Sequence, residues 1–155
     1  MTLTGLMAAN TVHTISIAGI SDMAGNTMAT VASLFTTGSD VDLSGPSATV
    51  VFSPSSGATG VPITVAPSVT FGEPIDPVRA LTISSQGYGV LLYAAGTGQP
   101  VAVTYSVSAD FRTVIVTPTV PLQSGTQYQL LAYVGITDLA GNAYGSYNAI
   151  TFTTQ

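Results

Sequence analysis

The chain has 155 residues, of which 46% are hydrophobic and only 6% are charged, and its formal net charge is −5. Two arginines and no lysine leave nothing to neutralise a row of phosphates, which excludes a nucleic-acid-binding protein. No stretch approaches the roughly 20 apolar residues that a membrane-spanning helix needs. The absence of cysteine excludes disulfides, thiolate metal sites and cysteine nucleophiles.

The chain contains an internal repeat centred on one octapeptide. Residues 19–26 read GISDMAGN, and residues 135–142 repeat them as GITDLAGN, 116 residues further on. The Asp carboxylate accepts backbone N–H groups a residue or two ahead, and Gly and Asn tolerate positive φ. Each copy lies between two β-rich runs, which predicts the tip of a hairpin. After the octapeptide the second copy has one extra residue, and with that gap Phe35 aligns with Phe152.

The repeat divides the chain into an incomplete copy and a complete one. Residues 1–38 are predicted to be the C-terminal part of a preceding repeat, folded as a hairpin with strands at 11–18 and 30–37. A linker marked by Pro and Gly follows at 39–46. Residues 47–155 are then predicted to form a complete domain.

Within the complete copy, short strands alternate with turns. Residues 54–60 and 73–77 are predicted turns, Pro67 indicates an edge strand or a bulge, and 78–86 fits either a helical turn or a strand. Hairpin arms are expected on either side of 96–98. The predicted strands lie at residues 48–53, 63–71, 89–94, 101–107, 113–118, 126–134 and 147–154.

Two alternating sets are predicted to face the core of a β-sandwich. These sets are Val101, Val103, Tyr105 and Val107, and Tyr128, Leu130, Ala132 and Val134. Tyr128 stands near the start of its strand, where a sandwich places a corner tyrosine that bonds back to the backbone. The repeat sets Val12 at that place in the first copy, so the corner is expected to be missing there. It also sets His13 against Gln129, as an exposed residue on the opposite face.

Four motifs occur in the order found in one known family. They are PSSGATGVP at 54–62, VTFGEPID at 69–76, TDLAGN at 137–142 and FTT at 152–154. In these motifs the chain resembles the bacterial Ig-like domain of surface-layer type. The resemblance implies an all-β, immunoglobulin-like β-sandwich of about seven strands. It also implies a tandem spacer module of surface-layer proteins, adhesins or secreted enzymes, without an active site.

The sequence offers no catalytic constellation. The single histidine, His13, lies in the incomplete copy, and no nucleophile-elbow motif accompanies it. Glu73 and Asp76 are imaginable as a carboxylate pair, but their setting between prolines fits a turn better. The chain is therefore predicted not to be an enzyme and to carry no cofactor.

The acids suggest one metal hypothesis. If alternate loops lie at the same end of a sandwich, six of the seven acids gather at the end facing the preceding repeat. Oxygen ligands of this kind suit Ca²⁺, which would stiffen the repeat junction. The alternative is that loops collect acids for turn formation and solubility, partly neutralised by Arg79 and Arg112. The proposed ligands are Asp40, Asp42, Glu73, Asp76 and Asp138.

Two functions are compatible with these features. The first is a non-enzymatic extracellular or cell-surface module, a building block or spacer of a surface layer, adhesin or filament. Its partners would be neighbouring Ig-like repeats or identical subunits, and its N-terminal hairpin either is a cut end or donates strands to another chain. The second is an accessory glycan- or protein-binding module of a larger secreted enzyme. Its candidate residues are Tyr88, Tyr93, Tyr133, Tyr144 and Tyr147.

Overall fold

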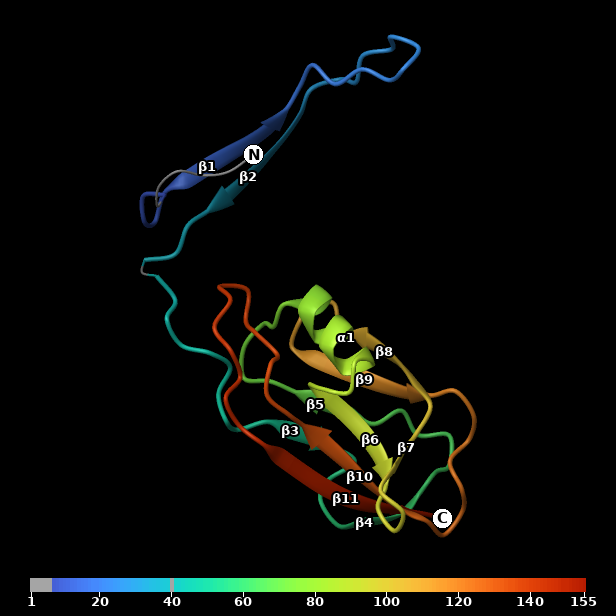
Figure 1. Ribbon diagram of the computed structural model, residues 1–155. Helices are drawn as coiled ribbons and strands as arrows, with labels where there is room; N and C mark the ends of the chain where they lie inside the picture. The colour runs from blue at the N-terminus through green and yellow to red at the C-terminus, as the bar shows by residue number, and fades with distance from the viewer. Residues whose placement is uncertain (1–6, 40) are drawn as a thin grey trace. The chain divides into compact units, whose positions relative to one another are not determined.

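The computed structural model describes residues 7–39 and 41–155 of the chain. The polypeptide forms two units, residues 1–42 and residues 43–155 (Figure 1). Within the described residues, no helix is long and apolar enough to cross a membrane.

The first unit is an antiparallel hairpin of β1 (Val12–Ile17) and β2 (Val31–Thr36). Both strands were predicted from the sequence and are confirmed. Nearly every side chain along them is exposed, and only His13 and Phe35 are half-buried. A hairpin of only two strands is marginally stable in water by itself.

The second unit is an Ig-like sandwich of two sheets, which confirms the predicted fold class. One sheet has five strands in the order β4-β11-β10-β6-β7, and the other has four in the order β3-β5-β9-β8. The described strands of this unit number nine, where about seven were expected. They are β3 (Val51–Ser53), β4 (Ala58–Val61), β5 (Ser68–Thr70), β6 (Val90–Ala94), β7 (Gln99–Pro100), β8 (Val103–Val107), β9 (Thr113–Pro118), β10 (Gln127–Ala132) and β11 (Asn148–Thr154).

The segment that the sequence left open between helix and strand is a helix, α1 (Pro77–Ser85). Asp76 begins it, because its carboxylate accepts hydrogen bonds from the backbone N–H groups of Val78 and Arg79 at 2.9 and 3.1 Å. Pro77 occupies the first turn, where its missing N–H costs nothing. The N-cap at Asp76 and the proline after it therefore favour the helix, although the helix and strand propensities of the segment do not distinguish the two.

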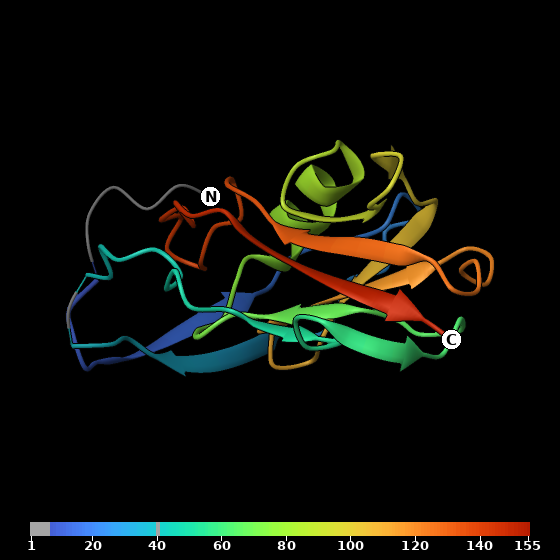
Figure 2. The same ribbon diagram turned by 90° about the horizontal axis from the view of Figure 1, so that it is seen from below.

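Three strand predictions were wrong in their details. Residues 58–61 form β4, which pairs in parallel with β11, although residues 54–60 were predicted to form a turn (Figure 2). Pro67 marks neither an edge nor a bulge, because it precedes β5 and β5 lies between β3 and β9. The arm after the turn at 96–98 is the two-residue β7, and 103–107 crosses to the other sheet as β8.

The core lies between the two sheets and under α1. Tyr128, Leu130 and Ala132 are buried in it as the alternation predicted, but Val134 is 40% exposed because β10 has already ended. The corner tyrosine is confirmed, since the backbone N–H of Gln123 donates to Tyr128 Oη at 2.9 Å. The largest fully buried side chains are Tyr144, Phe71, Phe152, Ile75, Leu92, Leu130, Ile136, Val69, Val90, Val114, Val116 and Pro67.

Candidate functional sites

Three acid-bearing loops of the second unit meet at one end, as the sequence predicted for them. The N–H of Ile75 donates to the carbonyl of Phe111 at 2.7 Å, and the N–H of Asp76 donates to that of Thr137 at 2.8 Å. Both arginines also hold these loops, because Arg79 donates to the carbonyl of Gly135 and Arg112 to that of Gly72. The end is therefore a rigid cluster of mutually bonded loops.

Asp138 is the buried acid of this end, with 3% of its surface exposed. One carboxylate oxygen accepts from the backbone N–H groups of Ala140 and Asn142 at 2.8 and 2.9 Å, and the other accepts from the Asn142 side chain at 2.8 Å. Burial raises the pKa of Asp138, but these hydrogen bonds together outweigh it and hold the pKa below its ordinary value. The carboxylate stays ionised and fixes the turn.

The remaining predicted calcium ligands are not equivalent to Asp138. Asp76 caps α1 with its carboxylate. A carboxylate oxygen of Glu73 lies within 4.8 Å of one of Asp138. Asp40 lies outside the described residues, and Asp42 belongs to the first unit. Calcium binding by these acids stays a prediction, to be tested by calorimetric titration and by melting with and without EDTA.

The hairpin of the first unit carries a second candidate site on one face. In the sandwich, Phe152 pairs with Tyr128 and their rings stack with centroids 5.8 Å apart. In the hairpin, Phe35 pairs with His13 and their rings stack at 5.4 Å. His13, not Val12, therefore occupies the position of the corner tyrosine, so the sequence alignment of β1 was wrong by one residue.

The physical reason is a second length difference between the copies. The first copy lacks one residue before the octapeptide as well as one after it, and the alignment placed only the later gap. Because side chains alternate along a strand, a slip of one residue moves every side chain to the other face. His13 thus lies on the face that corresponds to the sandwich core, together with Ile15, Ile17, Val31 and Phe35.

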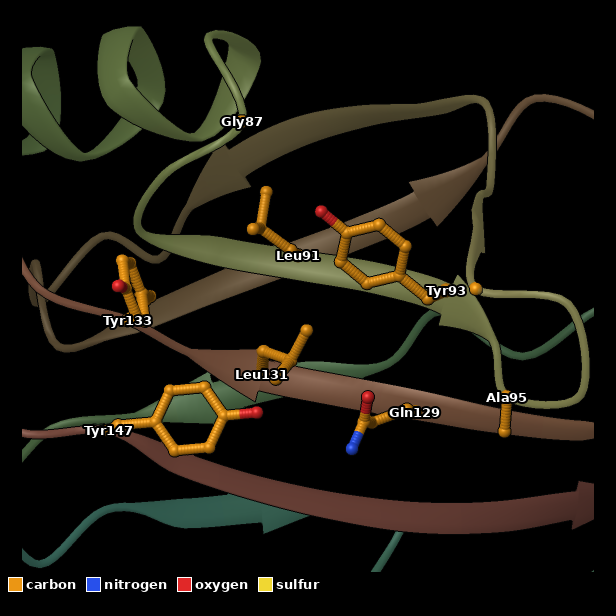
Figure 3. Close-up of a pocket in the computed structure, with 9 residues that line it drawn as sticks. Gly87, Leu91, Tyr93, Ala95, Gln129, Leu131, Tyr133 and Tyr147 are labelled. Atoms are coloured by element: carbon orange, nitrogen blue, oxygen red, sulfur yellow. The ribbon is translucent and has the colours of Figure 1, made fainter.

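A third candidate site lies on the outer face of the five-stranded sheet. A hollow of about 390 Å³ is lined there by residues of β6, β10 and the adjoining loops (Figure 3). Tyr93, Tyr133 and Tyr147 line it, and Tyr88 stacks on Tyr133. Tyr144 was wrongly grouped with them, because it is fully buried and contacts Phe71 in the core.

Sequence reasoning missed the floor of this hollow. Leu91 and Leu131 are register partners on β6 and β10, and both line it. Gln129 lies two residues before Leu131 on the same face. The available signal was the alternation in β10, which puts a leucine on the face opposite the core.

Comparison with known proteins confirms the family resemblance. Residues 43–154 match the family described as bacterial Ig-like domain. The chain belongs to this family of bacterial Ig-like domains. No curated protein matches the chain.

Solved structures of the same fold come from several bacterial proteins. PcoC, a methionine-rich copper resistance protein from Escherichia coli, is 16% identical with a TM-score of 0.52, over 72% of this chain and 100% of that one. CopC from Methylosinus trichosporium OB3b is 17% identical with a TM-score of 0.50, over 68% and 91%. The bacterial S-layer protein SbsC is 22% identical with a TM-score of 0.47. That match covers 63% of this chain and 13% of the SbsC chain.

Proposed function

We propose that the protein is a non-enzymatic structural module of the bacterial cell surface, a building block or spacer of a surface layer, adhesin or filament. Membership in the bacterial Ig-like family supports the module, and the matching S-layer protein supports its setting. The partners are neighbouring Ig-like repeats or identical subunits. The work of such a module is mechanical, because packed sandwiches hold repeats at fixed spacing.

The observation that carries this proposal is the apolar face of the hairpin. This face, called the core-type face below, carries His13, Ile15, Ile17, Val31 and Phe35. Ile15 and Ile17 correspond to Leu130 and Ala132, which the sandwich buries, yet Ile15 is 53% and Ile17 44% exposed. Val31, which pairs with Ile17 on the same face, is 55% exposed. Exposed contiguous apolar surface of this kind marks protein–protein contacts. We infer that the hairpin completes its layer by strand donation, with this face packed on a neighbouring chain.

The test is light scattering on a sizing column over a range of concentrations, with a matched pair of variants. Ile15→Asp places a charge on the core-type face, whereas Leu34→Asp places it on the opposite face of the same hairpin, where Leu34 is 68% exposed. We expect the wild-type mass to rise above 15.6 kDa with concentration. Ile15→Asp abolishes this rise, and Leu34→Asp retains it.

Two outcomes contradict strand donation between copies. One is a monomer at every concentration, and the other is an equal loss of association in both variants.

The tyrosine-lined hollow favours a second candidate function, that of an accessory glycan- or protein-binding module of a larger secreted enzyme.

A further inference from the structure

The hollow on the outer face of the five-stranded sheet has an apolar floor and a polar rim. Leu91 and Leu131 lie at its centre, with Tyr133 and Tyr147 at one end and Tyr93 and Gln129 at the other (Figure 3). From Gln129 to Tyr133 the chain spans about 13 Å at the usual rise of a strand. The hollow is thus an elongated, shallow surface suited to a chain-like ligand.

Three tyrosine rings form one cluster at the end of this surface. The rings of Tyr88 and Tyr133 stack with centroids 6.4 Å apart, and Tyr147 meets Tyr133 edge-on at 5.6 Å. Tyr88 is 56%, Tyr133 37% and Tyr147 58% exposed. The three rings contact one another while leaving ring surface open, so a ligand meets an aromatic platform.

Polar atoms with unused hydrogen-bonding capacity surround the floor. Among the described residues, the hydroxyl groups of Tyr93 and Tyr147 and the side-chain amide of Gln129 make no hydrogen bond, and none is sealed from solvent. Both hydroxyl groups point toward the leucines (Figure 3). Together they offer donors and acceptors to a polar ligand from both ends of the hollow.

None of the residues that line the hollow is charged. A phosphorylated or acidic ligand would lie there without a cation to pair with it, and a basic one without an anion. A wholly apolar partner, or the core-type face of a second copy, would bury the hydroxyls and the amide unbonded, which is unfavourable. The ligand that fits has apolar faces, many hydroxyl groups and no charge.

We propose that this hollow is a binding site for a neutral oligosaccharide. The C–H face of one sugar ring stacks on Tyr147 or Tyr133, the next ring lies over the leucine floor, and sugar hydroxyls bond to Tyr93 and Gln129. The site is independent of the hairpin, since it lies wholly within the second unit. The inference rests on the second candidate function, that of a glycan-binding module, and names the class of glycan that this hollow takes.

The test is a titration of the full chain followed by amide chemical shifts. The neutral probes are cellohexaose, maltohexaose and the hexamer of N-acetylglucosamine, and the charged control is the hexamer of galacturonate. At least one neutral hexamer is expected to bind saturably up to several millimolar, with its largest shifts at residues 91, 93, 129, 131, 133 and 147. The galacturonate hexamer is expected to give none.

Matched variants locate the contact. Tyr147→Ala weakens binding by roughly tenfold, which corresponds to about 1.4 kcal/mol, whereas Tyr147→Phe retains the ring and most of the affinity. Phe111→Ala serves as the control, because Phe111 is a comparably exposed aromatic residue at 44% that does not line the hollow. Ile15→Asp, which tests the hairpin, leaves glycan binding unchanged.

Several results overturn the proposal. They are the absence of shifts with every neutral hexamer, shifts that lie elsewhere, equal binding of galacturonate, or affinity unaffected by Tyr147→Ala. Self-association that is lost in Tyr147→Ala would assign the hollow to a second copy instead. A failure of either kind leaves the structural module untouched, because its own test uses the hairpin variants.

Discussion

The hairpin of β1 and β2 and the hairpin of β10 and β11 are built on the same turn and differ in what covers them. In the first, Asp22 accepts from the N–H groups of Ala24 and Asn26 at 2.9 Å each. In the second, Asp138 makes the same pair of bonds at 2.8 and 2.9 Å. Asp22 is exposed and Asp138 is buried. The turn is therefore a local device that forms with or without a core around it.

The strands behave differently from the turn. Phe152 is 1% exposed between the sheets, whereas its counterpart Phe35 is only half-buried on an open face. Most of the stability of a short hairpin comes from packing rather than from its own ladder. The comparison separates two contributions to the stability of a hairpin, that of the octapeptide turn and that of a second sheet packed against its strands.

The largest expected effect comes from shortening the stacked phenylalanine in each hairpin. Phe152→Ala leaves a cavity in the sandwich and lowers its free energy of unfolding by about 3–5 kcal/mol. Phe35→Ala changes it by less than about 0.5 kcal/mol, because that ring lies outside the sandwich. Urea unfolding followed by tyrosine fluorescence measures this unit alone, since all seven tyrosines lie in 88–147. Equal losses in both variants would show that the two units unfold together.

The next effect concerns the aspartate of each turn. Asp138→Ala leaves buried N–H groups without a partner and lowers the free energy of unfolding by about 1–3 kcal/mol. Asp22→Ala loses the same bonds where water replaces them, and the change stays below about 0.5 kcal/mol. Urea unfolding checks both, and a large loss in Asp22→Ala would mean that the first turn is covered in solution.

The corner tyrosine gives a smaller difference. Tyr128→Phe removes the acceptor of the Gln123 N–H and costs about 0.5–1.5 kcal/mol. Tyr105→Phe is the control, because the Tyr105 hydroxyl makes no hydrogen bond among the described residues. Thermal unfolding of both variants distinguishes the lost bond from the loss of a hydroxyl in general. Equal melting temperatures would contradict a stabilising role of the corner.

The smallest effect is on acid sensitivity. The pKa of Asp138 is lower in the folded chain than its ordinary 3.8, so its contribution to stability is present above that value. The contribution is lost as the pH falls through the folded pKa. Asp138→Asn retains the acceptor without the charge, and its stability is expected to fall less steeply than that of the wild type below about pH 4. Parallel curves for the two proteins would show that the hydrogen bonds do not favour the ionised form.

Local chemistry explains most of what the sequence predicted. The octapeptide turns, the alternation in β10 and the corner at Tyr128 follow from spacing and residue type alone. The short alternating strands also predicted a β-sandwich, and the family resemblance added that it is immunoglobulin-like. Asp76 also carried the signal for α1, although propensity left that segment undecided.

The predictions that were wrong or missing all concern contacts between segments that are separate in the sequence. β4 forms in a turn-rich stretch because β11 offers it a parallel edge. Tyr144 is buried because its loop folds back under Phe71, which no period in the sequence reveals. The register of β1 depended on a gap that only the stacked pair of His13 and Phe35 located. The tyrosine hollow needed three separate segments brought together on one sheet.

The parallel pairing of β4 and β11 also determines how the sandwich bears a load. The ladder joins Ala58 to Phe152 and Val61 to Thr154, so a strand from early in the unit lies beside its last strand, running the same way. When residues 43 and 155 are pulled apart, these two strands slide along each other and their hydrogen bonds are strained together. An antiparallel pair pulled from its open end would instead separate one bond at a time. A module joined in this way resists tension by shear.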